Sequence, residues 1–427
     1  MATQIEILDS IMGSSKTNGI LKWIDDNPNE RYIYVSPLIS EIDDTSRVMN
    51  DLKHVTFVQP TNDDNTKSED LLEKLREGSN ICCTHSLYLN MSEEHLEMIQ
   101  KWEYVVIIDE EVGVIDDFKT YSTDDLKYLL DNEDISISDV DGMISWVGKD
   151  VGAKAKYRYF YNLCRAKAVY ATKRKDTMMV TQLPVELFTR AKRVIIMTYM
   201  FDGNVLDAFL TLKKIETIPF TEVSTTVVCK EQIKKLIDLQ PINKTVNLLG
   251  MSYSDYKNKI TVKDCTTISN YIRGVCRKYD AKSVDVMYTF PKTLSTTARK
   301  GGKKISPIGF REYKVPKLDA DGDFVYDKLD KQVFDSLPCW LASSTRATNN
   351  YSFKWCLVHC YNRYPNLAVD SYLKDYQCSI DRNVFALSEM LQWIWRSRIR
   401  KGEPIVLAIA SQRMHNLFLD WLNEKNV

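Results

Sequence analysis

Five residues near the N-terminus have the types and the spacing of a phosphate-binding loop: Gly13, Ser14, Ser15, Lys16 and Thr17. An apolar run precedes them and apolar residues at helical spacing follow, which predicts a strand, a tight turn and a helix. The backbone N–H groups of such a turn converge on one concavity at the positive end of the helix dipole. We expect Lys16 to contact the β- and γ-phosphates of a nucleotide and Thr17 to bind Mg²⁺.

The loop departs from the usual phosphate-binding pattern at two places. Ser15 stands where a glycine normally precedes the lysine, and Ser10 stands where another glycine is usual. The alternative interpretation is an ordinary helix with a serine cap, because serine is a common residue at helix N-termini.

A second group of reactive side chains follows the apolar run YVVIIDEEV, residues 104–112. Such a run predicts a fully buried parallel strand that delivers acids to its carboxyl end, where ligands bind in open α/β sheets. Asp109 would hold Mg²⁺ through water, and Glu110 would orient and deprotonate the attacking water. The alternative interpretation is that the run is an ordinary core strand and that its three acids only begin a solvated loop.

Near the C-terminus, the apolar spacing predicts a helix over residues 386–402. Gln392, Arg396 and Arg400 recur every four residues, so on that helix they share one stripe. A Gln-Arg-Arg row can reach a γ-phosphate held by a neighbouring domain. An amphipathic helix with exposed arginines is the alternative.

Two basic stretches are candidate nucleic-acid surfaces. Residues 154–175 carry eight Lys and Arg residues with five interleaved aromatic residues. Aromatic faces stack on bases while Lys and Arg follow phosphates, but an amphipathic helix with a buried aromatic stripe explains the pattern equally well. Residues 299–317 are expected to form a basic loop that enters a hairpin. This loop either contacts the phosphate backbone of a nucleic acid or is an ordinary solvated surface loop. The basic residues at its start are Arg299, Lys300, Lys303 and Lys304.

The elements that must position these groups belong to a large α/β protein. At 427 residues the chain is long enough for two or three domains, and its 44% apolar and 27% charged content is ordinary for a globular protein. The net charge of −1 gives no overall basic field. We expect a cytoplasmic protein with no membrane contact, because no leader and no long apolar run is present. Ten cysteines and five histidines without a Cys-x-x-Cys pair predict reduced, buried thiols rather than zinc.

The order of these strings resembles superfamily 2 helicases of the DEAD/DEAH type, in particular the small helicase-like replication proteins of tailed bacteriophages. The matching strings run through nearly the whole chain: GSSKT for motif I, YVSPL for motif Ia, IIDEEV for motif II, MTYMFDG for motif III, STRATNNY near motif V and QWIWRSRIR for motif VI.

The resemblance implies an α/β fold with two RecA-like P-loop domains with mostly parallel sheets. The expected domains are residues 1–212, with a helical insertion at about 115–185, and residues 213–427. ATP and Mg²⁺ would bind between the domains. Lys16 and Thr17 would hold phosphates and metal, Asp109 and Glu110 would handle Mg²⁺ and water, and residues of motif VI would act from the second domain: Gln392, Arg396 and Arg400.

The resemblance also implies movement along single-stranded nucleic acid, with DNA favoured over RNA, and other replication proteins as further partners. Thr198 in motif III would couple hydrolysis to strand contacts. Groups at the strand exits would contact the phosphate backbone without reading sequence: Ser36, Pro37, Thr84 and His85.

Two other functions are compatible with the same strings. A viral genome-packaging ATPase shares both phosphate motifs, although the carboxylate cluster of its usual nuclease is not evident after Asp330. A loader or scaffold with weak or no hydrolysis is the other, because serine at position 15 restricts the backbone where the loop must approach phosphates.

Overall fold

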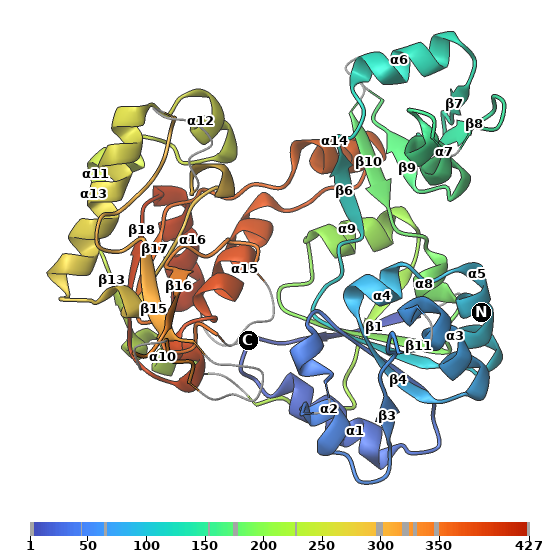
Figure 1. The fold of residues 1–427 in the computed structure, drawn as a ribbon, viewed down its shortest axis with the longest axis horizontal. Coiled ribbons are helices and arrows are strands. Elements are labelled where there is room, and N and C mark those ends of the chain that lie inside the picture. The colour runs from blue at the N-terminus through green and yellow to red at the C-terminus, as the bar shows by residue number, and fades with distance from the viewer. Residues whose placement is uncertain are drawn as a thin grey trace. The chain divides into compact units, whose positions relative to one another are not determined.

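A computed structural model describes residues 4–43, 45–63, 66–152, 154–173, 178–226, 229–295, 302–317, 324–327, 331–345 and 350–424 (Figure 1). The chain forms two compact units. Unit 1 comprises Met1–Val227 and Pro365–Phe385, and unit 2 comprises Val228–Tyr364 and Ala386–Val427. The first unit thus continues beyond residue 212, where we expected the boundary, and it includes a segment from the second half of the chain.

Unit 1 is built on a seven-stranded sheet with the order β12-β1-β11-β5-β2-β4-β3, and every neighbouring pair is parallel. The buried strand predicted within residues 104–112 is confirmed as β5. The strands of this sheet are β1 (Gln4–Asp9), β2 (Tyr32–Ser36), β3 (Phe57–Val58), β4 (Asn80–Thr84), β5 (Val105–Asp109), β11 (Arg193–Thr198) and β12 (Glu216–Pro219).

Helices cover both faces of this sheet, because its central strands are apolar on both sides. Along β5, Val106 and Ile108 belong to one hydrophobic cluster, whereas Val105 and Ile107 belong to the other. This is the burial expected of a parallel sheet. The helices are α1 (Lys16–Asp26), η1 (Ile39–Glu41), α2 (Arg47–Asn50), α3 (Lys67–Glu77), α4 (His85–Leu89), α5 (Glu93–Lys101), α8 (Glu186–Thr189) and α9 (Val205–Leu212).

The insertion contains strands as well as helices, so the expected helical insertion is wrong in this respect. Strands β6, β10 and β9 form an antiparallel sheet, and β7 pairs with β8. A small core of its own, which includes Phe118, Leu129 and Phe160, holds these elements together. They are β6 (Ile115–Phe118), α6 (Thr123–Asp131), β7 (Ile135–Ile137), β8 (Ile144–Trp146), α7 (Arg158–Arg165), β9 (Val169–Ala171) and β10 (Met179–Gln182).

Helix α14 (Leu367–Asp375) comes from the second half of the chain and completes unit 1. The Tyr372 hydroxyl donates to Asp141 O at 2.7 Å, and the Tyr372 and Tyr170 rings meet edge to face at 5.9 Å. Tyr372 and Leu373 belong to the same buried cluster as the central strands. The core of unit 1 is therefore built from two stretches that lie far apart in the sequence.

Unit 2 is built on a four-stranded sheet with the order β13-β18-β17-β14, which is parallel throughout. The protein is thus mixed α/β with mostly parallel sheets. The apolar run TVNLLGM at residues 245–251 favours a strand, but α11 and a turn occupy these residues. The elements around the sheet are α10 (Lys230–Leu236), β13 (Ile237–Leu239), α11 (Lys244–Asn247), α12 (Tyr253–Asn258), α13 (Val262–Lys278), η2 (Ser283–Asp285), β14 (Val286–Thr289), η3 (Lys292–Leu294), β17 (Cys356–His359), α15 (Arg382–Ile394), η4 (Arg398–Lys401), β18 (Ile405–Ile409) and α16 (Gln412–Asn423).

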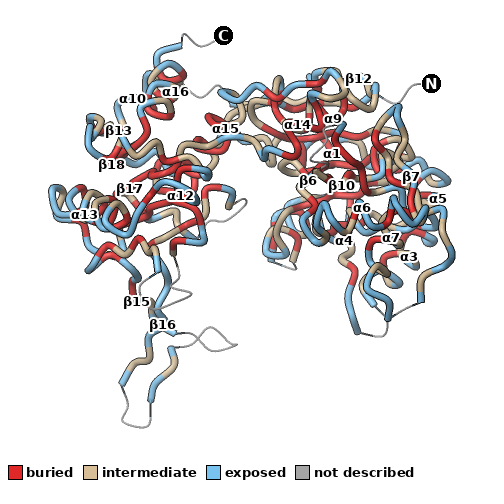
Figure 2. Tube along the Cα trace, turned by 90° about the horizontal axis from the view of Figure 1, so that it is seen from above, coloured by how far each residue is buried: buried red, intermediate tan, exposed pale blue. Residues whose placement is uncertain are grey.

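A two-stranded antiparallel ribbon, β15 (Glu312–Pro316) with β16 (Phe334–Pro338), confirms the hairpin predicted after the basic loop. Most of its residues are exposed, as Figure 2 shows. The ten cysteines are free thiols and all but Cys229 are buried, as expected. Among the described residues, no helix is both long and apolar enough to cross a bilayer.

Candidate functional site

The turn between β1 and α1 has the backbone of a tight loop. Gly13 and Ser15 lie in the left-handed region, with φ of 84° and 64°. Ser15 is the residue before α1, and its side chain makes no capping hydrogen bond, which disfavours the interpretation as an ordinary serine-capped helix. Ser14 is buried, and its hydroxyl accepts from the Ser10 hydroxyl at 2.8 Å. The first residues of α1 are Lys16 and Thr17, so their backbone N–H groups lie at the positive end of the helix dipole.

Lys16 folds back over this turn. Its Nζ donates to the carbonyl oxygen of Ser10, and it lies 3.3 Å from the carbonyl oxygen of Ile11. The ammonium group is therefore held at the mouth of the loop by neutral oxygens. A phosphate, which carries a full charge, is a stronger acceptor for an ammonium group than these carbonyls.

Asp109 lies at the end of β5 in a crowded acidic environment. The Tyr34 hydroxyl donates to Asp109 Oδ2 at 2.9 Å, and His85 Nε2 lies 2.8 Å from Asp109 O. Burial, together with the charges of Glu110 and Glu41, raises the pKa of Asp109 to about 7. The hydrogen bond from Tyr34 and the charge of Lys16 act in the opposite direction. Lys16 and Asp109 therefore lie close enough to influence one another.

The sheet register explains why these groups meet. In the parallel ladder, Asp9 at the end of β1 pairs with Thr198 at the end of β11, and Met197 pairs with Asp109. The carboxyl ends of three adjacent strands thus lie at one edge, where open α/β sheets bind ligands. The Ser10 N–H also donates to Thr198 O at 3.1 Å, so the loop begins beside β11.

Two acids at this edge were not among the predicted site residues. Glu111 Oε1 accepts from Thr198 Oγ1 at 2.6 Å and also from Asn204 Nδ2, which links the ends of β5, β11 and α9. Glu41 Oε2 accepts from the Ser36 hydroxyl at 2.9 Å. The run of three acids at residues 109–111 was a usable signal for Glu111, whereas only the fold brings Glu41 close to Asp109.

The donor set of this edge suits a magnesium ion shared with phosphates. Mg²⁺ is usually bound by one or two protein oxygens together with phosphate oxygens and water. The Asp109 carboxylate and the Thr17 hydroxyl are such ligands, and a divalent cation would offset the mutual repulsion of Asp109, Glu110 and Glu41. Among the described residues, no cluster of three or more His, Cys, Asp or Glu forms a metal site of the closed type.

Three of the four predicted nucleic-acid contacts in unit 1 have intramolecular hydrogen-bond partners. The Ser36 hydroxyl donates to Glu41, and the Thr84 hydroxyl caps α4 by accepting from Leu87 N. His85 contacts the backbone of β5, and Pro37 follows directly after β2. All four residues lie at or just beyond the carboxyl ends of β2 and β4, as predicted.

In unit 2, the basic loop is described only in part. Lys303 Nζ lies 3.3 Å from Lys257 O, and Lys303 and Lys304 are half-buried. Arg299 and Lys300 lie outside the described residues.

The predicted helix over residues 386–402 is wrong beyond Ile394, where α15 ends. The Ser397 hydroxyl donates to Ile394 O at 2.7 Å, and Arg398 N donates to Lys354 O at 3.0 Å, so the backbone leaves the helical path. The 3₁₀ helix η4 follows. Gln392, Arg396 and Arg400 consequently do not form a stripe on one helix: Arg396 is buried, Arg400 is exposed, and Gln392 donates to Ser388 Oγ at 3.2 Å.

The basic and aromatic run of the insertion supplies much of its core and its surface ion pairs. Phe160 is buried and stacks on Phe118 at 5.9 Å. Lys156 pairs with Asp125 at 2.5 Å and lies over the Tyr157 ring at 4.7 Å. These contacts favour the structural interpretation for the described part of the run.

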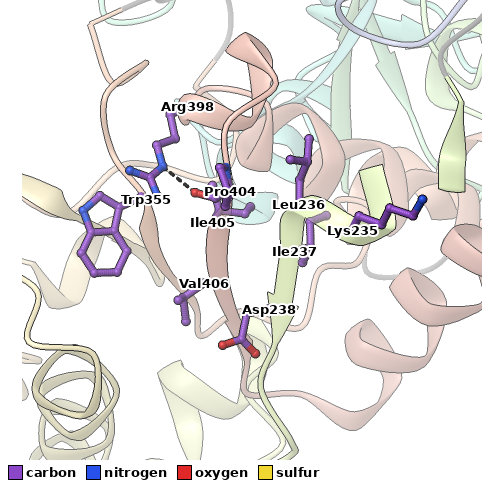
Figure 3. Close-up of a pocket in the computed structure, with 9 residues that line it drawn as sticks. All are labelled: Lys235, Leu236, Ile237, Asp238, Trp355, Arg398, Pro404, Ile405 and Val406. Atoms are coloured by element: carbon purple, nitrogen blue, oxygen red, sulfur yellow. Dashed lines mark hydrogen bonds between the residues drawn. The ribbon is translucent and has the colours of Figure 1, made fainter. Parts of the chain in front are cut away.

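Unit 2 also has a pocket of about 280 Å³ at the amino ends of β13 and β18 (Figure 3). Most of its lining residues are apolar, and the Arg398 guanidinium lies 5.4 Å from the centre of the Trp355 ring. It lies opposite the carboxyl edge of its own sheet, and none of the predicted site residues lines it.

Comparison with known proteins gives one match to a family model and one over the full length. The YonV C-terminal Rossmann-like domain matches residues 231–422, which include the whole parallel sheet of unit 2. The SPbeta prophage-derived uncharacterized protein YonV of Bacillus subtilis (strain 168) is 27% identical over 451 residues and covers 99% of both chains. The second half of this chain thus resembles a Rossmann-like domain, and the whole chain resembles a prophage protein.

Two solved structures are similar at low identity. S. tokodaii Xpd4 has a TM-score of 0.46 at 12% identity, over 99% of this chain and 95% of that chain. Bacteroides sp Pif1 in complex with ADP-AlF4 has a TM-score of 0.25 at 10% identity, over 98% of this chain and 92% of that chain.

Proposed function

We propose that this chain is an ATP-dependent nucleic-acid helicase or translocase that acts in phage DNA replication or repair. The observation that carries the proposal is the arrangement at the carboxyl edge of the sheet in unit 1. A left-handed turn with Lys16 and Thr17 lies at the start of a helix, and Asp109 lies two strands away with a pKa raised to about 7 and within the field of Lys16. Phosphoryl transfer needs a cradle for the phosphates, a metal ligand and a group that positions water.

Each residue has a role in this proposal. Lys16 would leave its carbonyl partners to bind the β- and γ-phosphates, and Thr17 and Asp109 would hold Mg²⁺, which neutralises charge on the phosphates. Glu110 would orient the attacking water and accept its proton. Glu110 has a φ of 62°, a backbone conformation that side-chain-bearing residues adopt at a cost and that often marks functional positions.

Single-stranded DNA is the proposed polymer, and similarity to a prophage-derived protein supports a phage setting for the activity. Its phosphates would lie along the ends of β2 and β4, near Ser36, Pro37, Thr84 and His85. Lys303 and Lys304 would add positive charge in unit 2, together with Arg299 and Lys300. Of the three predicted residues in unit 2, Arg400 is exposed and is the proposed contribution to hydrolysis, whereas Arg396 is buried and Gln392 donates to Ser388.

The test is the rate of ATP hydrolysis with and without oligothymidylate. We expect DNA to stimulate the wild-type rate, and Lys16→Ala and Glu110→Gln each to lower it by roughly 100-fold or more. Lys22→Ala and Glu97→Gln change exposed charges on α1 and α5 and serve as matched controls. Turnover that survives Lys16→Ala would refute the assignment of the loop. Binding of ATP without turnover in the wild type would instead favour a loader.

A further inference from the structure

Residues 220–226, which we call the brace segment, run from the end of β12 along the outside of the phosphate loop. The Phe220 N–H donates to Ile7 O on β1 at 2.9 Å. At the other end, the Thr226 N–H donates to Ser14 O at 2.9 Å. The segment is thus bonded both to the strand that precedes the loop and to the loop itself.

The middle of the brace segment packs against helix α1. A Cβ atom on Gly19 would lie 2.3 Å from Val223 Cγ1, so the absence of a side chain at Gly19 is what admits Val223. One turn further along α1, Trp23 Nε1 donates to Glu222 Oε2 at 2.7 Å. Glu222 Oε1 in turn accepts from Arg193 Nη2 at 2.7 Å. The position of the segment is therefore fixed by contacts that lie outside the loop.

The bond from Thr226 acts on the most strained part of the loop. Ser15 has a φ of 64°, a conformation that glycine adopts freely but other residues adopt at a cost. The peptide group between Ser14 and Ser15 is planar and trans, so its C=O and N–H point in opposite directions. Because the Thr226 N–H binds this carbonyl oxygen, the N–H of Ser15 points away from Thr226.

We propose that the brace segment is a positioning element that holds the Ser14–Ser15 peptide in its anion-binding orientation and compensates for serine in place of the usual glycine. This inference rests on the proposed binding of nucleotide to the loop. It assigns to the backbone N–H of Thr226, and to the fit of Val223 on Gly19, a role in nucleotide affinity although neither contacts the nucleotide.

Thr226→Pro tests the bond directly, because proline has no backbone N–H, and Thr226→Ala is the matched control that keeps it. We expect Thr226→Pro to weaken the binding of ATP-Mg²⁺, measured by calorimetry, by about tenfold, which corresponds to about 1.4 kcal/mol. Thr226→Ala should stay within about twofold of the wild type. Val223→Ala is a second variant with an expected loss of about threefold, in case Thr226→Pro does not fold.

Ser15→Gly distinguishes a specific brace from general disruption. Glycine adopts a positive φ without help, so the loss caused by Thr226→Pro should fall from about tenfold to below about threefold in the Ser15→Gly background. An equal loss in both backgrounds, or unchanged affinity in Thr226→Pro and in Val223→Ala, would overturn the proposal.

Hydrogen exchange of peptides that cover residues 11–17 gives a readout without nucleotide. We expect faster exchange in Thr226→Pro than in Thr226→Ala. If the wild type binds no nucleotide, the proposed function fails, but hydrogen exchange still tests whether the brace segment holds the loop. Equal exchange rates in Thr226→Pro and Thr226→Ala would overturn the brace proposal.

Discussion

The Thr198 hydroxyl donates a hydrogen bond of 2.6 Å to Glu111 Oε1, joining the end of β11 to the residues that follow β5. Asn204, the N-terminal cap of α9, donates to the same oxygen. One carboxylate thus links two strand ends and a helix directly beside Asp109 and Glu110. This link holds the acidic end of β5 in register with the strand beside the phosphate loop.

Removal of the donor should destabilise unit 1. Thr198→Val keeps the shape of a buried side chain but leaves the half-buried Glu111 with one bond fewer, and a hydrogen bond to a charged group contributes about 1.5–3 kcal/mol. Urea unfolding measures the loss. Thr198→Ser keeps the hydroxyl and should recover most of the stability, and equal stability of the Val and Ser variants would contradict this role.

The affinity for ATP-Mg²⁺ should depend on pH through Asp109. Because Mg²⁺ competes with the proton for this carboxylate, and its pKa is raised to about 7, affinity should rise with pH and level off above about 7. Below that pH, the affinity for ATP-Mg²⁺ should fall by up to about tenfold for each pH unit. Titration calorimetry over a pH series checks this, with Asp150→Asn, an exposed residue, as control.

The same group sets the sign of a stability change in the absence of ligand. In the folded protein the pKa of Asp109 is raised above the ordinary value of 3.8. The contribution of this carboxyl to the free energy of unfolding is therefore fully present below pH 3.8 and is lost as the pH rises through about 7. Asp109→Asn should flatten this part of the pH–stability curve. A slope that persists in Asp109→Asn would assign the pH dependence to another group.

Gly19→Ala should destabilise the protein although alanine favours helix. The gain in helix propensity is about 1 kcal/mol, but the new methyl group would overlap Val223, whose branched side chain has few rotamers. In the Val223→Ala background the space is open, so the same substitution should become neutral or stabilising. Chemical denaturation of the wild type, the two single variants and the double variant measures this coupling. Additive effects would show that the contact is not tight.

Glu389→Gln should strongly destabilise unit 2. Glu389 Oε2 pairs with Arg363 Nη2 at 2.7 Å, and the two side chains are only 9% and 17% exposed. Loss of one partner from a buried pair typically costs about 3–5 kcal/mol, since the other charge stays buried. Glu231→Gln, an exposed residue on α10, is the control and should change stability by less than about 0.5 kcal/mol. A loss below about 1 kcal/mol in Glu389→Gln would show that water reaches Arg363.

Sequence reasoning predicted the elements whose signal is local. The strand that ends at Asp109 is a continuous apolar run, and the loop before α1 has a Lys-Thr pair at a strand–helix junction, so both were recognisable. Their meeting at one edge follows from the rule for parallel sheets. The positive φ of Ser15 and the bonds that hold Glu111 involve partners far along the chain, and no local pattern predicts them.

The errors have physical causes of the same kind. Thr245–Met251 reads as an apolar strand, but Asn243 caps α11 by accepting from Val246 N. The helical spacing of apolar residues continues past Ile394 in the predicted helix at residues 386–402. The Arg398 N–H nevertheless donates to Lys354 O rather than to a carbonyl of the same helix, so the helix ends. In the insertion, strands of three or four residues are too short to show alternation, so only the helices were expected.

The contribution of residues 365–385 to unit 1 has a consequence during synthesis. A ribosome releases the chain from its N-terminus, so the sheet strands of unit 1 emerge long before α14. Until Phe385 is outside the exit tunnel, the side chains that α14 covers, such as Tyr170, stay without their native neighbour. The amino-terminal half therefore cannot complete its core until most of the polypeptide has been translated, and until then its uncovered apolar side chains are accessible to chaperones.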